Sequence, residues 1–256
     1  MKAARASLEH WVQFVNPFQR LEQAVCSLEE ELKAIETAPP VWPPDESRTE
    51  DYLVAIGKYT DNAMRVRKTG LCLRMLAPVY AEAFVNFVLC FFRNEGLAAS
   101  DEEYRNAVRL PINERVLRLP TYCRGFSGAL QEEATEYREF LRLMNGRNDW
   151  VHGNCDPTQL KVGNVFFDGT IPLWQKDEST IIRLVEHSMQ HVAKADALKD
   201  VETVRAFIRW VLAGLEVKVR ISVGQLMGCE YPGIQSDTGR AGILLPNTIH
   251  ESYLGR

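Results

Sequence analysis

An apolar run at residues 79–92, VYAEAFVNFVLCFF, constrains the fold of this chain more than any other feature. It is apolar nearly all round at helical spacing, which is typical of a helix buried inside a protein. Its length of about 14 residues is less than the ~20 that a bilayer-spanning helix needs. We therefore expect a cytoplasmic helical protein built around this segment, with no membrane partner.

Helical periodicity extends over most of the remaining chain. Asn16 before Pro17 predicts a helix start, SRTE at 47–50 predicts a capping box, and the prolines of 38–44 and Gly70 predict helix ends. Pro78 is expected to kink or split the third helix. In the second helix, we expect Leu53, Ile56, Met64 and the neighbouring aromatic residues to face inward. The predicted helices cover about 17–37, 47–68, 71–94, 129–145, 178–195 and 199–227, with two short ones after Ser100 and between Pro111 and Pro120.

Residues 162–175, VGNVFFDGTIPLWQ, differ from this pattern, because two β-rich runs flank Asp168-Gly169. That dipeptide suits a two-residue hairpin turn, and Pro172 restricts its strand to an edge. The tail from Gly228 has five glycines, two prolines and no period, so we expect it to be irregular. The sequence thus predicts an all-α bundle with a small β-hairpin insertion and a C-terminal helical extension. Its expected parts are an N-terminal helix and linker (1–46), the bundle (47–227) and the tail (228–256).

Charge and cysteine usage limit the classes of protein further. The net charge of −4 excludes a uniformly basic surface, so any nucleic-acid contact has to come from a local patch. Six cysteines without a C-x-x-C pair predict structural thiols in a reducing cytosol. Eight arginines and five glutamates between residues 105 and 147 leave a local excess of +3. Four of these arginines are expected between helices, as RNA-phosphate contacts or as part of a solvated face: Arg109, Arg115, Arg118 and Arg124.

The stretch LMNGRNDWVHGN, residues 143–154, contains the candidate site. Arg147 and His152 are five positions apart, which is about 140° on an ideal helix, so they share a face only if the helix breaks near Gly146. Spacing alone is weak support, because Arg5 and His10 repeat it in the same chain.

A second set of polar residues lies inside the apolar run. Glu82 and Asn86 are four positions apart and therefore share one helix face. A buried carboxylate without a partner is costly, so some other group must satisfy Glu82. The candidates are Arg147, Asn148 and His152, which predicts a polar cavity between this helix and residues 143–154.

The run RNDWVHG resembles the R-N-x-x-x-H signature of HEPN domains, which are small α-helical bundles found widely in prokaryotic defence and toxin–antitoxin systems. The resemblance covers about residues 47–155 in motif order, with Glu82 or Asn86 in the place of an acidic or amide residue on an earlier helix. It implies a metal-independent endoribonuclease without a cofactor, which acts on RNA as a homodimer and has an antitoxin or defence protein as a partner. In such an enzyme the RNA 2′-hydroxyl attacks the adjacent phosphate.

The residue types suit this reaction. His152 titrates near neutral pH and can transfer a proton, and Arg147 can stabilise the charge that develops on the phosphate. Asn148 could orient either group, Glu82 could fix Arg147, and Asp149 could pair with an arginine or cap a turn.

Two alternatives stay open at this point. Arg147, Glu82 and His152 could form a buried network that only specifies the fold, in a non-catalytic bundle that binds nucleotides, RNA or a protein. His187 and His191 have the spacing of a metal site, but no third ligand is evident, so we expect two surface histidines and no metal.

Overall fold

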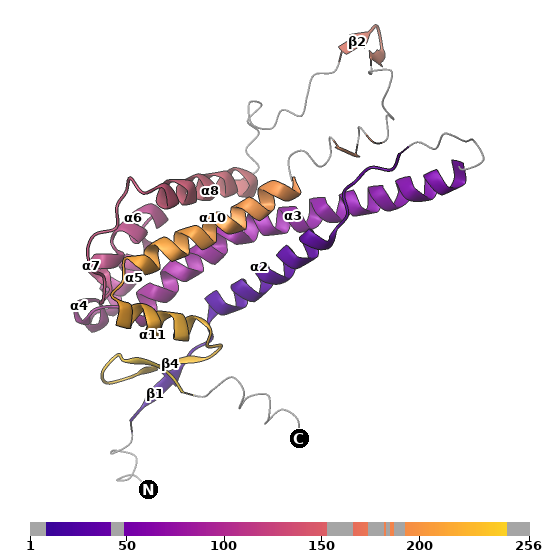
Figure 1. The fold of residues 1–256 in the computed structure, drawn as a ribbon. Coiled ribbons are helices and arrows are strands. Elements are labelled where there is room, and N and C mark those ends of the chain that lie inside the picture. The colour runs from indigo at the N-terminus through magenta and orange to yellow at the C-terminus, as the bar shows by residue number, and fades with distance from the viewer. Residues whose placement is uncertain are drawn as a thin grey trace, which may run out of the picture. The chain divides into compact units, whose positions relative to one another are not determined.

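The computed structural model describes residues 9–41, 49–152, 166–173, 182, 185–186 and 193–244. This part of the chain is all-α with small β elements, which confirms the predicted fold class. It forms two compact units that differ from the predicted division. Unit 1 contains Met1–Ala24, Pro78–Leu143 and Thr203–Arg256, and unit 2 contains Val25–Ala77 and Met144–Glu202. Four helices, shown in Figure 1, continue from one unit into the other: α2 (Pro17–Ala34), α3 (Thr49–Phe91), α8 (Thr135–His152) and α10 (Lys194–Ala213).

Helix α3 is a single helix of 43 residues, so the predicted helix end at Gly70 and the predicted split at Pro78 are wrong. Glycine and proline inside a helix cost about 1 and 3 kcal/mol, respectively. A row of buried side chains continues along the helix past both Gly70 and Pro78. The burial of this row outweighs the cost of the glycine and the proline. Apart from the neighbours Tyr80 and Ala81, the buried residues of the row are three, four or seven positions apart: Tyr52, Tyr59, Ala63, Val66, Leu73, Ala77, Tyr80, Ala81, Phe84, Val88 and Phe91.

The same row corrects the predicted orientation of the first half of α3. Tyr52 and Tyr59 are buried, as expected for the aromatic residues, but Leu53 and Met64 are 60 % and 58 % exposed. The helix face predicted to be buried is therefore about one residue away from the face that is buried in the structure.

The length of α3 also removes the argument that its apolar segment is too short for a membrane. By length and composition, Glu50–Phe91 is the one described helix that could cross a bilayer. Half of its most apolar window is buried inside the protein, as in the core helix of a soluble protein. Its composition is therefore weak support for a membrane span.

Helices α2 and α3 are antiparallel. In unit 1 the ring of Phe18, near the start of α2, stacks on Tyr80 with centroids 5.0 Å apart. In unit 2 the amide nitrogen of Asn62 donates to the carbonyl oxygen of Glu36 at 3.0 Å.

Asn16 joins the start of α2 to the end of α11 (Val217–Met227) in unit 1. Its side-chain oxygen accepts from the backbone nitrogen of Gln19 at 3.2 Å, which confirms the predicted helix cap. Its amide nitrogen donates to the carbonyl oxygens of Leu226, Met227 and Cys229 at 3.3, 3.1 and 2.9 Å. One fully buried side chain thus satisfies backbone groups at the ends of two helices.

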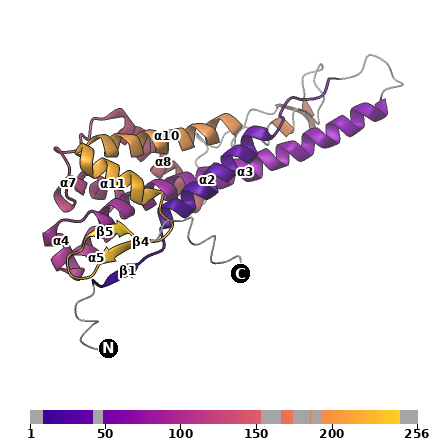
Figure 2. The same cartoon turned by 60° about the horizontal axis from the view of Figure 1, so that its bottom comes forward.

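The tail that was expected to be irregular forms two strands, β4 (Pro232–Gln235) and β5 (Ala241–Ile243). Strand β4 lies between β5 and the N-terminal strand β1 (Trp11–Gln13), and both pairings are antiparallel, as Figure 2 shows. Strands of three or four residues are too short for a period to be recognised, and the partner of β4 is more than 200 positions away. The prediction of an irregular tail is therefore wrong for residues 232–243.

The predicted hairpin is present as β2 (Phe166–Asp168) and β3 (Ile171–Leu173). Asp168 pairs with Ile171, so the turn residues are Gly169 and Thr170, one position later than predicted. Gly169 has φ +62°, which a glycine adopts without strain.

Short helices connect the long ones in unit 1: α4 (Glu95–Ala99), α5 (Asp101–Arg109), α6 (Ile112–Leu117) and α7 (Leu119–Tyr122). The predicted helix 199–227 is divided between α10 and α11, because the backbone at 214–216 bonds to another segment. The oxygen of Gly214 accepts from the nitrogen of Ser127, and the nitrogen of Glu216 donates to the oxygen of Gly125. The predicted helix 178–195 falls mostly outside the described residues.

Replacement of Asn16 by alanine is expected to lower the free energy of unfolding by about 2–4 kcal/mol, because a cap is lost and buried carbonyl groups lose their donor. Urea denaturation of the full chain measures the change. Asn113→Ala, at an exposed asparagine, is the matched control and should stay within about 0.5 kcal/mol of wild type. Equal stability of the two variants would contradict the double role of Asn16.

Candidate functional site

The motif residues lie at the C-terminal end of α8, which runs without interruption from Thr135 to His152. The predicted helix end near Asn145 is therefore wrong, and the break considered at Gly146 is not present. A Cβ atom added at Gly146 would meet no neighbouring atom within 4 Å, so packing does not require glycine at this position.

Arg147 has unused hydrogen-bonding capacity. Its Nη2 donates to the side-chain oxygen of Asn148 at 3.1 Å, while its Nε is buried and has no hydrogen-bond partner. Within the described residues it has no carboxylate partner. Among the described residues, the guanidinium is therefore oriented by a neutral amide alone.

The remaining motif residues are placed only in part. Asn148 is exposed beside Arg147. Asp149 and His152 belong to the helix, but their side chains lie outside the described part of the chain, as do His187 and His191. The roles of His152 and Asp149 and the cavity expected at residues 143–154 stay predictions.

Arg115 supplies the partner that Glu82 requires. Its Nη1 donates to Oε1 of Glu82 at 3.1 Å and to the side-chain oxygen of Asn86 at 2.8 Å, and its Nη2 donates to the carbonyl oxygen of Leu110 at 2.8 Å. All four residues belong to unit 1. The shared face of Glu82 and Asn86 is confirmed, but the partner is Arg115 and not one of the expected candidates Arg147 and Asn148, while a contact of His152 with Glu82 stays a prediction.

The same contacts remove Arg115 from the predicted RNA-binding arginines. It is 6 % exposed, and three acceptors within the protein already occupy its guanidinium. Arg115 was predicted to lie between helices, whereas it lies within α6 and its side chain is buried. Desolvation of this cation is offset by the carboxylate and the two neutral oxygens, so its role is structural.

The other three predicted arginines are exposed, as a phosphate contact requires. Arg109 ends α5, Arg118 follows α6 and Arg124 follows α7. Arg118 donates from Nη1 to the hydroxyl of Tyr122 at 3.4 Å and lies 3.8 Å from Oε2 of Glu114. Both side chains of that ion pair are about half exposed, so solvent screens it and Arg118 remains available to a ligand.

Cys90 continues the polar row of Glu82 and Asn86 along α3. Burial raises the pKa of its thiol despite the nearby Arg93, and burial raises the pKa of Cys123 to about 12. Both thiols are therefore protonated at neutral pH and are poor nucleophiles. This agrees with the structural role expected for the cysteines.

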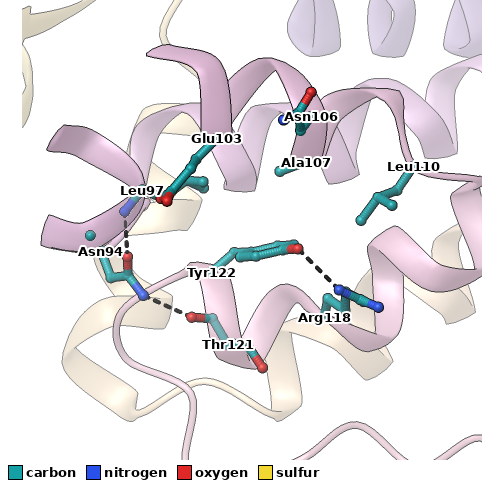
Figure 3. A pocket seen from close by; sticks show the side chains of 10 residues that line it. Asn94, Leu97, Glu103, Asn106, Ala107, Leu110, Arg118, Thr121 and Tyr122 are labelled. Atoms are coloured by element: carbon teal, nitrogen blue, oxygen red, sulfur yellow. Dashed lines mark hydrogen bonds between the residues drawn. The ribbon is translucent and has the colours of Figure 1, made fainter. Parts of the chain in front are cut away.

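A pocket of about 560 Å³ lies between α4, α5 and α7 in unit 1, as Figure 3 shows. The sequence contains no signal for this pocket, because the lining residues come from four short segments without a common motif. They are Asn94, Gly96, Leu97, Glu103, Asn106, Ala107, Leu110, Arg118, Thr121 and Tyr122.

Comparison of this chain with protein-family models, with curated proteins and with solved structures finds no match.

Replacement of Arg115 by alanine is expected to lower the free energy of unfolding by about 3 kcal/mol, because it leaves Glu82 without its counter-charge and Asn86 without its donor. Glu82→Ala should lower it by less, since the side chain of Glu82 is 32 % exposed and that of Arg115 only 7 %. Urea denaturation measures both changes.

Arg142→Ala is the control for Arg115→Ala, because Arg142 forms an exposed ion pair with Glu139 on α8. Its effect should not exceed about 0.5 kcal/mol. If Arg115→Ala lowered the free energy of unfolding no more than Arg142→Ala, the buried network would not stabilise unit 1.

Proposed function

We propose that this protein is a metal-independent endoribonuclease of the HEPN type, which acts in a prokaryotic defence or toxin–antitoxin setting. The main support is the state of Arg147, whose guanidinium is oriented by Asn148, has a buried Nε without a partner and has no carboxylate among the described residues. A cation in this state is suited to bind a phosphate group. The HEPN-like order Arg147-Asn148 and His152, on a helix of an all-α fold, adds to this support.

The proposed reaction is an intramolecular transesterification. The RNA 2′-hydroxyl loses its proton and attacks the adjacent phosphorus, the bond from phosphorus to the 5′-oxygen breaks, and that oxygen gains a proton. The products are a cyclic phosphate and a 5′-hydroxyl. His152 transfers the protons, Arg147 stabilises the negative charge of the pentacoordinate phosphate, and Asn148 holds Arg147 in position.

The proposed active form is a homodimer. Positions 147 and 152 are about 140° apart around one continuous helix, so the motif of a second copy would face the first and complete the site. An antitoxin or another defence protein that covers the motif would control the activity.

A second candidate is a non-catalytic bundle that binds RNA or a nucleotide. The pairing of Glu82 with Arg115 favours it, because the acidic residue expected to assist Arg147 is already engaged elsewhere. The lack of a carboxylate partner for Arg147 among the described residues supports phosphate binding in both candidates, and only the first requires His152 to transfer protons.

Total RNA incubated with wild-type protein in the presence of EDTA is expected to be cleaved to fragments with cyclic phosphate ends. Arg147→Ala and His152→Ala should each reduce the rate by about 10²–10³, since one removes charge stabilisation and the other removes the proton-transfer group. Gel electrophoresis measures the rate, and end-group analysis identifies the products.

Two variants serve as controls. Arg142→Ala removes an exposed arginine from the same helix, and the double variant Arg5→Ala/His10→Ala removes the other pair with the same spacing. Both should cleave at the wild-type rate. Cleavage by His152→Ala at the wild-type rate would contradict the proton-transfer role of His152, and no cleavage by wild type would favour the non-catalytic candidate.

A further inference from the structure

We propose that the pocket between α5 and α7 binds one nucleotide, with the base against Tyr122 and the phosphate on Arg118. All residues of this site belong to unit 1, and the inference does not rest on the proposed cleavage reaction. A volume of about 560 Å³ is within the range of about 300–1,000 Å³ that is usual for small-molecule sites.

The walls of the pocket are held in place by hydrogen bonds before any ligand binds. The side-chain oxygen of Asn94 accepts from the backbone nitrogen of Leu97 at 2.9 Å, and its amide nitrogen donates to the carbonyl oxygen of Thr121 at 2.7 Å. The backbone nitrogen of Asn94 donates to the carbonyl oxygen of Tyr122 at 2.8 Å. These bonds join α4 to α7, so a ligand would lose little free energy in ordering the site.

The interior of the pocket is apolar and has one aromatic wall. Leu97 and Ala107 are buried, and Leu110, directly after α5, lines the pocket at the end toward Arg118. Figure 3 shows the Tyr122 side chain crossing the pocket below Ala107, with its hydroxyl directed toward Arg118. A flat ring fits between a tyrosine and a small apolar residue, and nucleobases stack on aromatic side chains in this way.

The polar groups of the pocket have opposite charges at its two ends. Arg118 lies at the end toward the Tyr122 hydroxyl, and Glu103 lies beside Leu97 at the other end, as Figure 3 shows. Asn106 belongs to the lining between them and can donate or accept. A ligand with an anionic group at one end, a flat ring and an amine at the other would match all three features.

A nucleotide with an amino group on its base has this chemistry. The phosphate pairs with Arg118, and the carboxylate of Glu103 accepts from the exocyclic amine of adenine, cytosine or guanine. Uracil has no exocyclic amine, and its carbonyl oxygens would face the carboxylate. The site should therefore bind uridine nucleotides more weakly than the other three.

Isothermal titration of the full chain with AMP, CMP, GMP and UMP tests the proposal. We expect AMP, CMP and GMP to bind about tenfold more tightly than UMP. Tyr122→Leu should weaken AMP binding about tenfold, whereas Tyr122→Phe keeps the ring and should bind nearly as wild type. Glu103→Gln should reduce the difference between AMP and UMP.

Adenosine and a second arginine provide matched controls for the phosphate contact. Arg118→Ala should weaken binding of AMP about tenfold and leave adenosine unchanged, because adenosine has no phosphate. Arg124→Ala, at an exposed arginine outside the pocket lining, should bind AMP as wild type. No binding of any nucleotide at millimolar concentration, or wild-type affinity of both Tyr122→Leu and Arg118→Ala, would overturn the proposal.

A hexamer of 2′-O-methyl adenosine distinguishes an RNA strand from a free nucleotide as the source of the ligand, and it cannot be cleaved because it has no 2′-hydroxyl. Binding at least tenfold tighter than that of AMP supports an RNA strand, and equal binding supports a free mononucleotide.

Discussion

The contact of Arg115 with Glu82 and Asn86 is the interaction on which much of unit 1 depends. A carboxylate and an amide on the most apolar helix require polar partners, and one guanidinium supplies both. Its third bond, to the carbonyl oxygen of Leu110, fixes the corner between α5 and α6. Leu110 also lines the pocket between α5 and α7, so the network that neutralises Glu82 helps to define this pocket.

Arg115 and Arg147 have different surroundings, and this difference separates an arginine with a structural role from one that is proposed to have a functional role. Arg115 is almost fully buried and donates to three acceptors, so removal of its partners would leave an uncompensated charge. Both arginines have a buried Nε without a partner among the described residues, so the difference lies in the rest of the guanidinium, which in Arg147 donates there only to the neutral amide of Asn148. The first arrangement is typical of a fold-specifying network. The second leaves the cation available for an anion, and the proposed function depends on this difference.

The fold class, the Asn16 cap and the β2–β3 hairpin could be predicted from sequence, because each depends on residues close together in the chain. The unbroken course of α3 through Gly70 and Pro78 could not, since burial along its whole length outweighs local propensity. Strand β4 pairs with β1 across most of the chain, which no local signal indicates. At the site, the sequence predicts that Glu82 needs a partner, but Arg115 supplies it and was not among the predicted candidates Arg147, Asn148 and His152.

Binding of 2′-O-methyl RNA, measured by fluorescence anisotropy over a series of salt concentrations, tests most directly whether Arg147 binds phosphate. The account predicts that Arg147→Ala binds more weakly than wild type and than Arg142→Ala, at unchanged thermal stability. It also predicts that the slope of log K against log salt falls by about 0.7, the value for one phosphate contact on a single strand. Unchanged affinity and slope, together with a loss of stability, would contradict the account and place Arg147 in a structural network.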